Sequence, residues 1–216
     1  MNILITAGGT TEKIDSVRGI TNYSTGRLAA KCADVLWEHR IFYVCSANAA
    51  RPESTPREIR QVTSVTDLRN AVRDICRFNK IDAIIHAMAV SDYYVEGVYA
   101  EGHTKRAPKI PSGLSGLTIE LKPTIKVIST LRHHAPDAVI VGFKLMDDVS
   151  HEELIAAGKN ILAVNDCDYV LANDLADIKG ENHVGHLINK DGEYVTCRTK
   201  YSIAARIAQG IKGGRL

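Results

Sequence analysis

The first strand and the turn after it constrain the fold of this chain more than any other segment. Asn2–Thr6 is a short apolar run, and Ala7–Thr10 follows it with two adjacent glycines. A polar stretch then leads to Asn22–Gly26, where a helical pattern of apolar residues begins. A strand, a glycine turn and a helix that opens with hydroxyl groups are a common anion-binding arrangement in α/β proteins. We therefore expect a phosphate site near the start of the chain.

The common nucleotide fingerprints do not fit this turn. A dinucleotide site needs Gly-x-Gly-x-x-Gly with a helix immediately after it, and a P-loop needs Gly-Lys before Ser or Thr. Here the glycines are adjacent, the helix is delayed, and Gly26 is followed by Arg27. None of the eight tyrosines has a lysine four residues later, as a short-chain dehydrogenase would require. His183 and His186 point to opposite faces of a predicted strand, which argues against a zinc site.

Short apolar runs alternate with amphipathic segments along the chain. We expect strands at 2–6, 41–46, 58–62, 83–90, 138–143 and 168–172, and helices at 25–39, 66–78, 124–134, 151–164 and 200–212. This alternation predicts an α/β, Rossmann-like fold with a mainly parallel sheet and helices on both faces. Near the end, two strand-like runs flank Asp191-Gly192, which predicts a C-terminal β-hairpin. Ser64 or Thr66, and Ser150, are candidate N-caps.

Composition narrows the class of protein. A chain of 216 residues is expected to form one domain, 1–216, with a hydrophobic share of 45% and a charged share of 24%. A net charge of +2 gives no indication of a nucleic-acid or membrane partner. Five scattered cysteines, no apolar run near ~18 residues and no signal-peptide pattern predict a cytoplasmic protein.

Residues 96–116 are expected to form a long flexible loop. The segment contains four glycines, two prolines and three lysines or arginines, and it shows no periodicity. A loop of this length in a compact domain is usually a lid or a disordered piece. Its basic stretch, residues 105–110, would close over a phosphate as a flap, or would simply be solvated.

Three further polar features follow predicted strands, and each also has a purely structural explanation. Gly8, Gly9 and Thr10 would bring backbone close to an anion, or form a plain turn. Asn22, Ser24 and Thr25 would bind an anion at a helix start, or cap that helix. Asp92 would hold a metal or a ribose hydroxyl, or stabilise a turn. The combination favours a nucleotide-dependent enzyme.

Seven short motifs in register carry a resemblance to a known family. They are Ala7–Thr10, Asp15–Arg18, Asn22–Gly26, Ala89–Tyr93, Lys109–Ile110, Gly142–Leu145 and Ala172–Asp174. Over nearly its full length the chain resembles phosphopantothenate–cysteine ligases of coenzyme A biosynthesis, in their stand-alone bacterial form.

The resemblance implies a reaction in two steps. The carboxylate of 4′-phosphopantothenate attacks the α-phosphate of CTP or ATP with Mg²⁺, and pyrophosphate leaves. The amine of L-cysteine then attacks the acyl-nucleotide, and the nucleoside monophosphate leaves. The resemblance also implies a homodimer, with Asp191-Gly192 in a candidate interface element, and a separate phosphopantothenoylcysteine decarboxylase in the pathway.

The resemblance also assigns roles to residues. Asn22 would handle the pantothenate carboxylate and the acyl-nucleotide, Lys109 would reach the phosphates from the flap, and Asp92 would lie at the nucleotide and metal site. Residues matching the nucleotide and phosphate pocket are Gly8, Gly9, Ser24, Gly26, Ala89, Phe143 and Asn173, and Thr10 belongs to the same glycine turn.

This chain departs from the family pattern at a few positions. Tyr23 replaces a histidine common in bacterial members, and Lys109 lacks the lysines that often follow it. The choice between CTP and ATP stays open, with CTP favoured. Two alternatives also stay open: a flavin- or nicotinamide-dependent oxidoreductase with an atypical first turn, and a non-catalytic nucleotide-binding partner of the decarboxylase.

Overall fold

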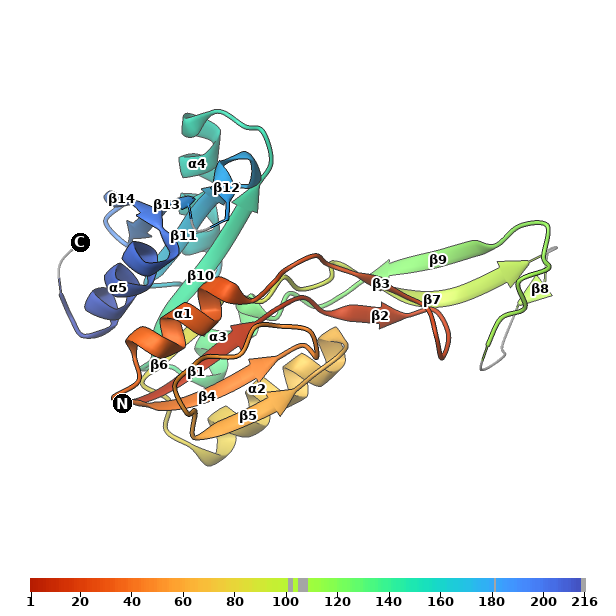
Figure 1. The fold of residues 1–216 in the computed structure, drawn as a ribbon, viewed down its shortest axis with the longest axis horizontal. Helices are drawn as coiled ribbons and strands as arrows, with labels where there is room; N and C mark the ends of the chain where they lie inside the picture. The colour runs from red at the N-terminus through yellow and green to blue at the C-terminus, as the bar shows by residue number, and fades with distance from the viewer. Residues whose placement is uncertain (101–102, 105–108, 181, 215–216) are drawn as a thin grey trace.

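A nine-stranded sheet forms the centre of the molecule (Figure 1). The computed structural model describes residues 1–100, 103–104, 109–180 and 182–214. Along the sheet the strands follow the order β12-β13-β11-β10-β6-β1-β4-β5, and β14 pairs with β13. The bounds are β1 Asn2–Ala7, β4 Arg40–Cys45, β5 Glu58–Gln61, β6 Ala83–His86, β10 Val139–Met146, β11 Tyr169–Asp174, β12 Ile178–Lys179, β13 Asn182–Asn189 and β14 Tyr194–Thr199.

Six neighbouring strands, β5 to β11 in the order above, are parallel. Strands β12, β13 and β14 complete the sheet in antiparallel pairs, with β13 and β14 joined across the Asp191-Gly192 turn. The predicted Rossmann-like fold and the C-terminal hairpin are both confirmed. Because β14 runs parallel to β11, the helix that follows β14 begins at the edge where the parallel strands end.

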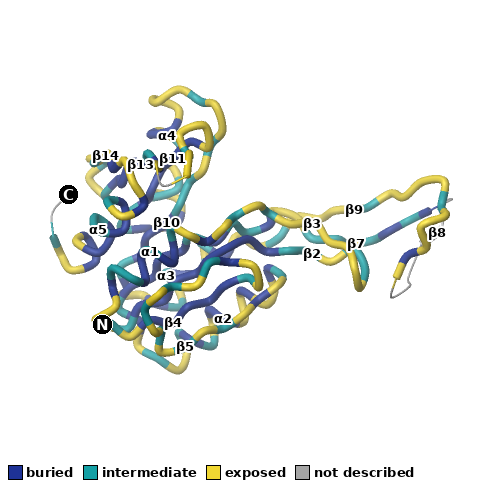
Figure 2. The backbone as a smooth tube through the Cα atoms, viewed as in Figure 1, coloured by how far each residue is buried: buried dark blue, intermediate teal, exposed yellow. Residues whose placement is uncertain are grey.

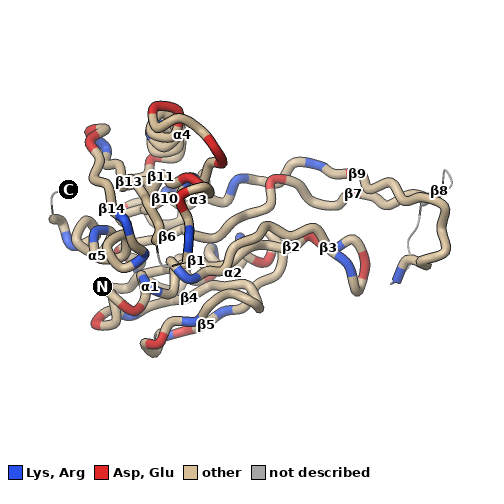
Figure 3. The backbone as a smooth tube through the Cα atoms, turned by 45° about the horizontal axis from the view of Figure 1, so that its top comes forward, with Lys and Arg blue, Asp and Glu red and all other residues tan. Residues whose placement is uncertain are grey.

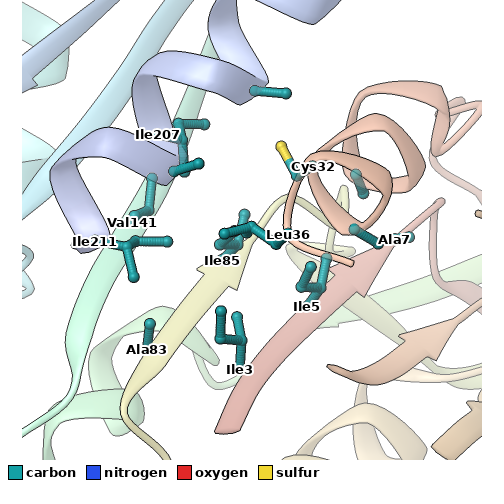
Figure 4. Close-up of a cluster of buried hydrophobic side chains, with 14 of the residues drawn as sticks. Ile3, Ile5, Ala7, Cys32, Leu36, Ala83, Ile85, Val141, Ile207 and Ile211 are labelled. Carbon is teal, nitrogen blue, oxygen red and sulfur yellow. The ribbon is translucent and has the colours of Figure 1, made fainter. Parts of the chain in front are cut away.

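Helices cover both faces of the sheet. They are α1 Arg27–Val35, α2 Val65–Phe78, α3 Ile128–His134, α4 His151–Val164 and α5 Lys200–Ile211. On one face α1 and α5 bury the side chains of Ile5, Ile85 and Val141, and Figure 4 shows this cluster. On the other face α2 and α3 cover Leu4, Ile84 and Ile140. Alternate residues of each central strand thus enter opposite cores, as two-sided burial requires.

Capping boxes fix the starts of three helices. Ser64 accepts a hydrogen bond from the Asp67 N–H, and Ser150 accepts one from the Glu153 N–H. Thr199 does the same for α5 through the Ser202 N–H. The predicted caps at Ser64 and Ser150 are confirmed, whereas Thr66 lies inside α2. Among the described residues, no helix has the length and apolar character needed to cross a membrane.

A slender arm projects from the body (Figure 1). Strand β7 (Tyr93–Ala100) pairs antiparallel with β9 (Thr118–Pro123), and β8 (His103–Thr104) extends the pair. A short hairpin, β2 (Thr11–Lys13) with β3 (Gly19–Thr21), lies along the base of the arm. Figure 2 shows the arm largely exposed or half-buried, in contrast to the buried body.

The prediction of a loop at 96–116 is therefore partly wrong, because strand β7 includes the first residues of that range, up to Ala100. A register shift between Val95 and Gly97 interrupts the alternation of side chains, which hides the strand in the sequence. The polar stretch between the glycine turn and Asn22 contains the β2–β3 hairpin instead of only a loop.

Two predicted helix starts, and the end of one strand, are also corrected. The first helix was expected from residue 25, but α1 begins at Arg27 after Gly26, whose φ of 69° is left-handed. The third was expected from residue 124, but α3 begins at Ile128 because Thr124 is held away from the helix by a hydrogen bond to the Ser91 carbonyl. Strand β6 ends at His86, so residues 87–90 form the loop that enters the arm.

Candidate functional site

A pocket of about 1040 Å³ lies where the parallel strands end. The segments that line it are Thr21–Ala29, His86–Asp92 and Thr124–Ile128, with further residues from β10, α4, β11, β13 and α5. This is the edge at which open α/β sheets bind ligands. The pocket therefore brings together most of the residues predicted from the sequence.

The two glycines of the first turn lie where the chain packs against itself. Gly8 has a φ of 87°, and a Cβ added there would come 2.1 Å from Ser46 Oγ. A Cβ added at Gly9 would come 1.9 Å from the Asn22 carbonyl oxygen. Neither glycine is among the residues that line the pocket. The structure thus gives these glycines a packing role, by bringing the Asn22 segment onto the end of β1.

The start of α1 opens into the pocket. Gly26 is the N-cap and has no side chain to cap the helix, but Thr25 Oγ1 accepts a long hydrogen bond of 3.5 Å from the Arg27 N–H in the first turn. The predicted hydroxyl cap is therefore confirmed only in part: Thr25 accepts this one bond from the position before the N-cap, and both Ser24 and Thr25 line the pocket. Free N–H groups and the positive end of the helix dipole favour an anion at such a start.

Asn22 is fixed by a small polar network. Its Nδ2 donates to the Val90 carbonyl at 3.2 Å, and its Oδ1 accepts from Ser91 Oγ at 3.4 Å. Thr10 is fully buried, accepts a 2.8 Å hydrogen bond from the Ser91 N–H and donates to Ser91 Oγ at 3.0 Å. Asn22 and Ala89 line the pocket, whereas Thr10 supports Asn22 and Ser91 from behind.

Asp92 is the one carboxylate among the described residues that line the pocket. Its side chain is 61% exposed and forms an ion pair with Lys126. No cluster of three metal-ligating side chains occurs among the described residues. Mg²⁺ is commonly bound by one or two carboxylates together with substrate phosphates and water. Asp92 therefore fits a metal ion that arrives with a triphosphate, but not one held by protein ligands alone.

Lys109 lies outside the pocket. It is exposed, and the next residue, Ile110, is held by the turn of the β2–β3 hairpin. The Ile110 N–H donates to Asp15 at 3.1 Å, and its carbonyl accepts from Arg18 at 2.6 Å. Figure 3 shows charges of both signs at this hairpin end. The other basic residues of the predicted flap, at 105 and 106, lie outside the described residues.

Two buried histidines in the pocket were not predicted as site residues. His86 Nδ1 lies 2.9 Å from Thr6 Oγ1, and burial lowers the pKa of His86 to about 4. Burial and nearby Lys200 likewise lower the pKa of His183 to about 4. Both imidazoles are therefore neutral near pH 7. A histidine within an apolar strand gave no sequence signal that would distinguish it from a core residue.

Phe143 and Asn173 line the same pocket from neighbouring strands β10 and β11. Asn173 is buried, and Phe143 is half-buried beside the α1 core. The apolar side chains of Leu175, Ile178 and Val164 complete this part of the wall. The pocket thus has a polar end at Asn22–Gly26 and Asp92, and a more apolar end toward β11 and β13.

A family model, a curated relative and solved structures all relate this chain to the same family. A family model described as "DNA/pantothenate metabolism flavoprotein C-terminal domain" matches residues 1–213. A curated relative, the coenzyme A biosynthesis bifunctional protein CoaBC of Thermococcus kodakarensis, is 30% identical over 207 residues. That match covers 95% of this chain but 49% of the relative. The chain therefore spans about half the length of the curated relatives it matches.

Solved structures show the same fold. The DNA/pantothenate metabolism flavoprotein from Streptococcus pneumoniae has a TM-score of 0.89 and 31% identity, and the match covers 99% of both chains. The C-terminal domain of a coenzyme A biosynthesis bifunctional protein CoaBC has a TM-score of 0.74 and 26% identity. That match covers 98% of this chain and 94% of the other.

Proposed function

This chain belongs to the DNA/pantothenate metabolism flavoprotein C-terminal domain family, and on that premise we propose that it is a phosphopantothenate–cysteine ligase. The reaction joins 4′-phosphopantothenate to L-cysteine through an acyl-nucleotide. The observation that carries the proposal is the pocket, which combines an open helix start, a fixed amide at Asn22 and an apolar end. Its volume of about 1040 Å³ leaves room for two substrates side by side.

The proposed chemistry follows from charge. A carboxylate must approach a triphosphate, so two anions have to be held together. The start of α1 offers N–H groups to phosphate oxygens, and Asn22 Nδ2 orients a carboxylate without adding charge. Asp92 would hold Mg²⁺ on the triphosphate, which would neutralise part of the developing charge. Holding two reactants in register lowers a barrier by about 7–11 kcal/mol, so no covalent nucleophile is needed.

An oxidoreductase is not favoured. A hairpin, β2–β3, separates β1 from α1, so the glycine turn does not lead directly into a helix as a dinucleotide pyrophosphate site requires. Neighbouring protein atoms instead occupy the space in which a side chain at Gly8 or Gly9 would lie.

Several finer features belong to the same proposal. We propose CTP in preference to ATP, Lys109 as a phosphate contact on closure of the arm, and a homodimer that acts in the cytoplasm. The arm supports the dimer, because a narrow antiparallel ribbon has little core of its own and exposes Tyr93 and Leu121.

A pyrophosphate-release assay tests the proposal. Purified protein is mixed with 4′-phosphopantothenate, L-cysteine, Mg²⁺ and either CTP or ATP. We expect pyrophosphate and the nucleoside monophosphate in equal amounts, with release dependent on 4′-phosphopantothenate. No release with either nucleotide from a folded sample would reject the ligase. Light scattering after gel filtration tests the dimer separately.

A further inference from the structure

His86 ends strand β6 with an imidazole of which the protein uses one nitrogen. The residue is 6% exposed and lines the pocket. The register of the sheet places His86 beside Thr6 of the neighbouring strand β1, and its Nδ1 lies 2.9 Å from Thr6 Oγ1. Among the described residues, Nε2 of the same ring has no hydrogen-bond partner. Nearly all buried polar groups in proteins are hydrogen-bonded, so this nitrogen requires an explanation.

Thr6 decides which nitrogen of His86 carries the proton. Its hydroxyl is fully buried and already accepts a hydrogen bond from the Met88 N–H at 3.2 Å. A hydroxyl has one hydrogen to donate, and a buried donor is rarely left unpaired. Within the described part of the chain, His86 Nδ1 is the acceptor that this hydrogen can reach. Thr6 therefore donates to Nδ1, and the proton of the neutral imidazole is on Nε2.

The Nε2–H group is open to the pocket. Among the described residues, the side-chain atoms that are both enclosed and unpartnered belong to His39, Ser54 and His183. His86 Nε2 is unpartnered but not enclosed, and the residue lines the pocket. Because burial lowers the pKa of His86 to about 4, the ring is neutral near pH 7. His86 thus presents one uncharged N–H donor of fixed position to the pocket.

The surroundings of this donor are apolar. Ile84 of the same strand faces the α2–α3 side of the sheet, and the alternation of a strand places His86 on that side too. Met88, Val127 and Ile128 line the pocket and take part in the apolar packing on this side. A phosphate or carboxylate loses far more than an uncharged group on leaving water for such surroundings. The donor therefore suits an uncharged acceptor.

We propose that His86 Nε2–H donates a hydrogen bond to an uncharged acceptor of a bound substrate, and that Thr6 holds the imidazole in the tautomer required. The acceptor is a carbonyl oxygen, a ring nitrogen or a hydroxyl group. The assignment rests on the proposed ligase function, whose substrates offer such groups in two places. One is the nucleoside part of the triphosphate, and the other is the amide and hydroxyl part of 4′-phosphopantothenate. His86 is thus a binding residue and Thr6 a positioning residue.

Nitrogen-15 NMR of the histidine side chains tests the tautomer, and the signal that is missing from His86→Gln identifies His86. At pH 7 we expect the wild-type ring to carry its proton on Nε2. Thr6→Ser keeps the hydroxyl and should keep this tautomer, whereas Thr6→Val should allow a proton on Nδ1. A proton on Nδ1 in the wild type would overturn the proposal, whether or not the protein is a ligase.

Calorimetry tests the contact with CTP, cytidine, inorganic tripolyphosphate and 4′-phosphopantothenate, each alone. His86→Asn can still accept from Thr6 but has no donor at the position of Nε2, so we expect it to weaken binding of at least one substrate about tenfold. His86→Gln can place an amide N–H near that position and should recover most of the affinity. A loss for CTP and cytidine assigns the acceptor to the nucleoside, and a loss for 4′-phosphopantothenate alone assigns it to that substrate.

A matched control and the wild-type reaction complete the test. His133→Asn changes an exposed residue outside the pocket and should leave every affinity unchanged. Thermal unfolding shows whether each variant is folded. Unchanged binding of both substrates to folded His86→Asn, or a loss for tripolyphosphate as large as that for CTP, would overturn the assignment. A failure of the ligase proposal is distinguishable, because it appears as no pyrophosphate release from the wild type.

Discussion

Gly9 shows how a single residue without a side chain decides the geometry of this site. A Cβ there would come 1.9 Å from the Asn22 carbonyl oxygen, and this oxygen belongs to the backbone and has little freedom to move. We expect Gly9→Ala to lower the free energy of unfolding by about 2 kcal/mol or more. Urea unfolding measures the change. Gly113→Ala is the control, because nothing lies within 4 Å of that position; equal effects of the two variants would contradict the explanation.

Asn22 illustrates a second effect at the residue scale. In Asn22→Asp, a carboxylate oxygen would replace the Nδ2 group that now donates to the Val90 carbonyl, and it would also repel the substrate carboxylate. We expect turnover to fall at least tenfold, with consumption of the acyl-nucleotide impaired. Asn70→Asp, an exposed change on α2, is the control. Wild-type turnover in Asn22→Asp would remove Asn22 from the mechanism.

At the scale of elements, the turn of β2–β3 holds the segment next to Lys109. The Asp15 carboxylate accepts hydrogen bonds from the Val17, Arg18 and Ile110 N–H groups and pairs with the Arg18 guanidinium at 2.5 Å. These donors, the guanidinium foremost, hold the pKa of Asp15 well below its usual range. The hairpin therefore fixes residues at the base of the proposed flap.

Asp15→Asn should loosen this contact, because an amide nitrogen would face N–H donors and the negative charge would be lost. Hydrogen bonds to a charged acceptor are stronger than those to a neutral one. We expect amide exchange in residues 109–123 to be at least tenfold faster, measured by hydrogen–deuterium exchange and mass spectrometry. Asp147→Asn, an exposed substitution on the body, should leave exchange in the arm unchanged. Wild-type exchange in Asp15→Asn would show that the contact does not order the arm.

The free energy of unfolding of the whole molecule should depend on pH through the protonation of His86. Its pKa is about 4 in the folded state and about 6.5 when unfolded, so the unfolded chain binds more protons between these values. The contribution of neutral His86 to the free energy of unfolding is fully present above pH 6.5. About 3 kcal/mol of it is lost as the pH falls toward 4. Urea unfolding from pH 7 to pH 4 should show a shallower pH dependence for His86→Gln than for wild type. His133→Gln is the exposed control; equal slopes for His86→Gln and wild type would exclude His86 as the source.

The sequence by itself determined the architecture, and the reason is local. Runs such as Asn2–Ala7 can be buried on both faces only in a parallel sheet covered by helices, and Asp191-Gly192 specifies a tight hairpin turn. Motif order also sufficed to indicate the family. These signals depend on neighbouring residues, so they can be read without knowing which distant segments meet.

Only the tertiary structure decided how the site is assembled, because packing brings together residues far apart in the chain. The close approach of Gly9 to Asn22, the contact of Ile110 with Asp15 and the position of His183 in the pocket all depend on such long-range contacts. The sequence did not predict the arm for the same reason. Strand β7 forms through its pairing with β9, and the register of that pairing is irregular. Periodicity is a local property, whereas a pocket lined by residues from many different elements is not.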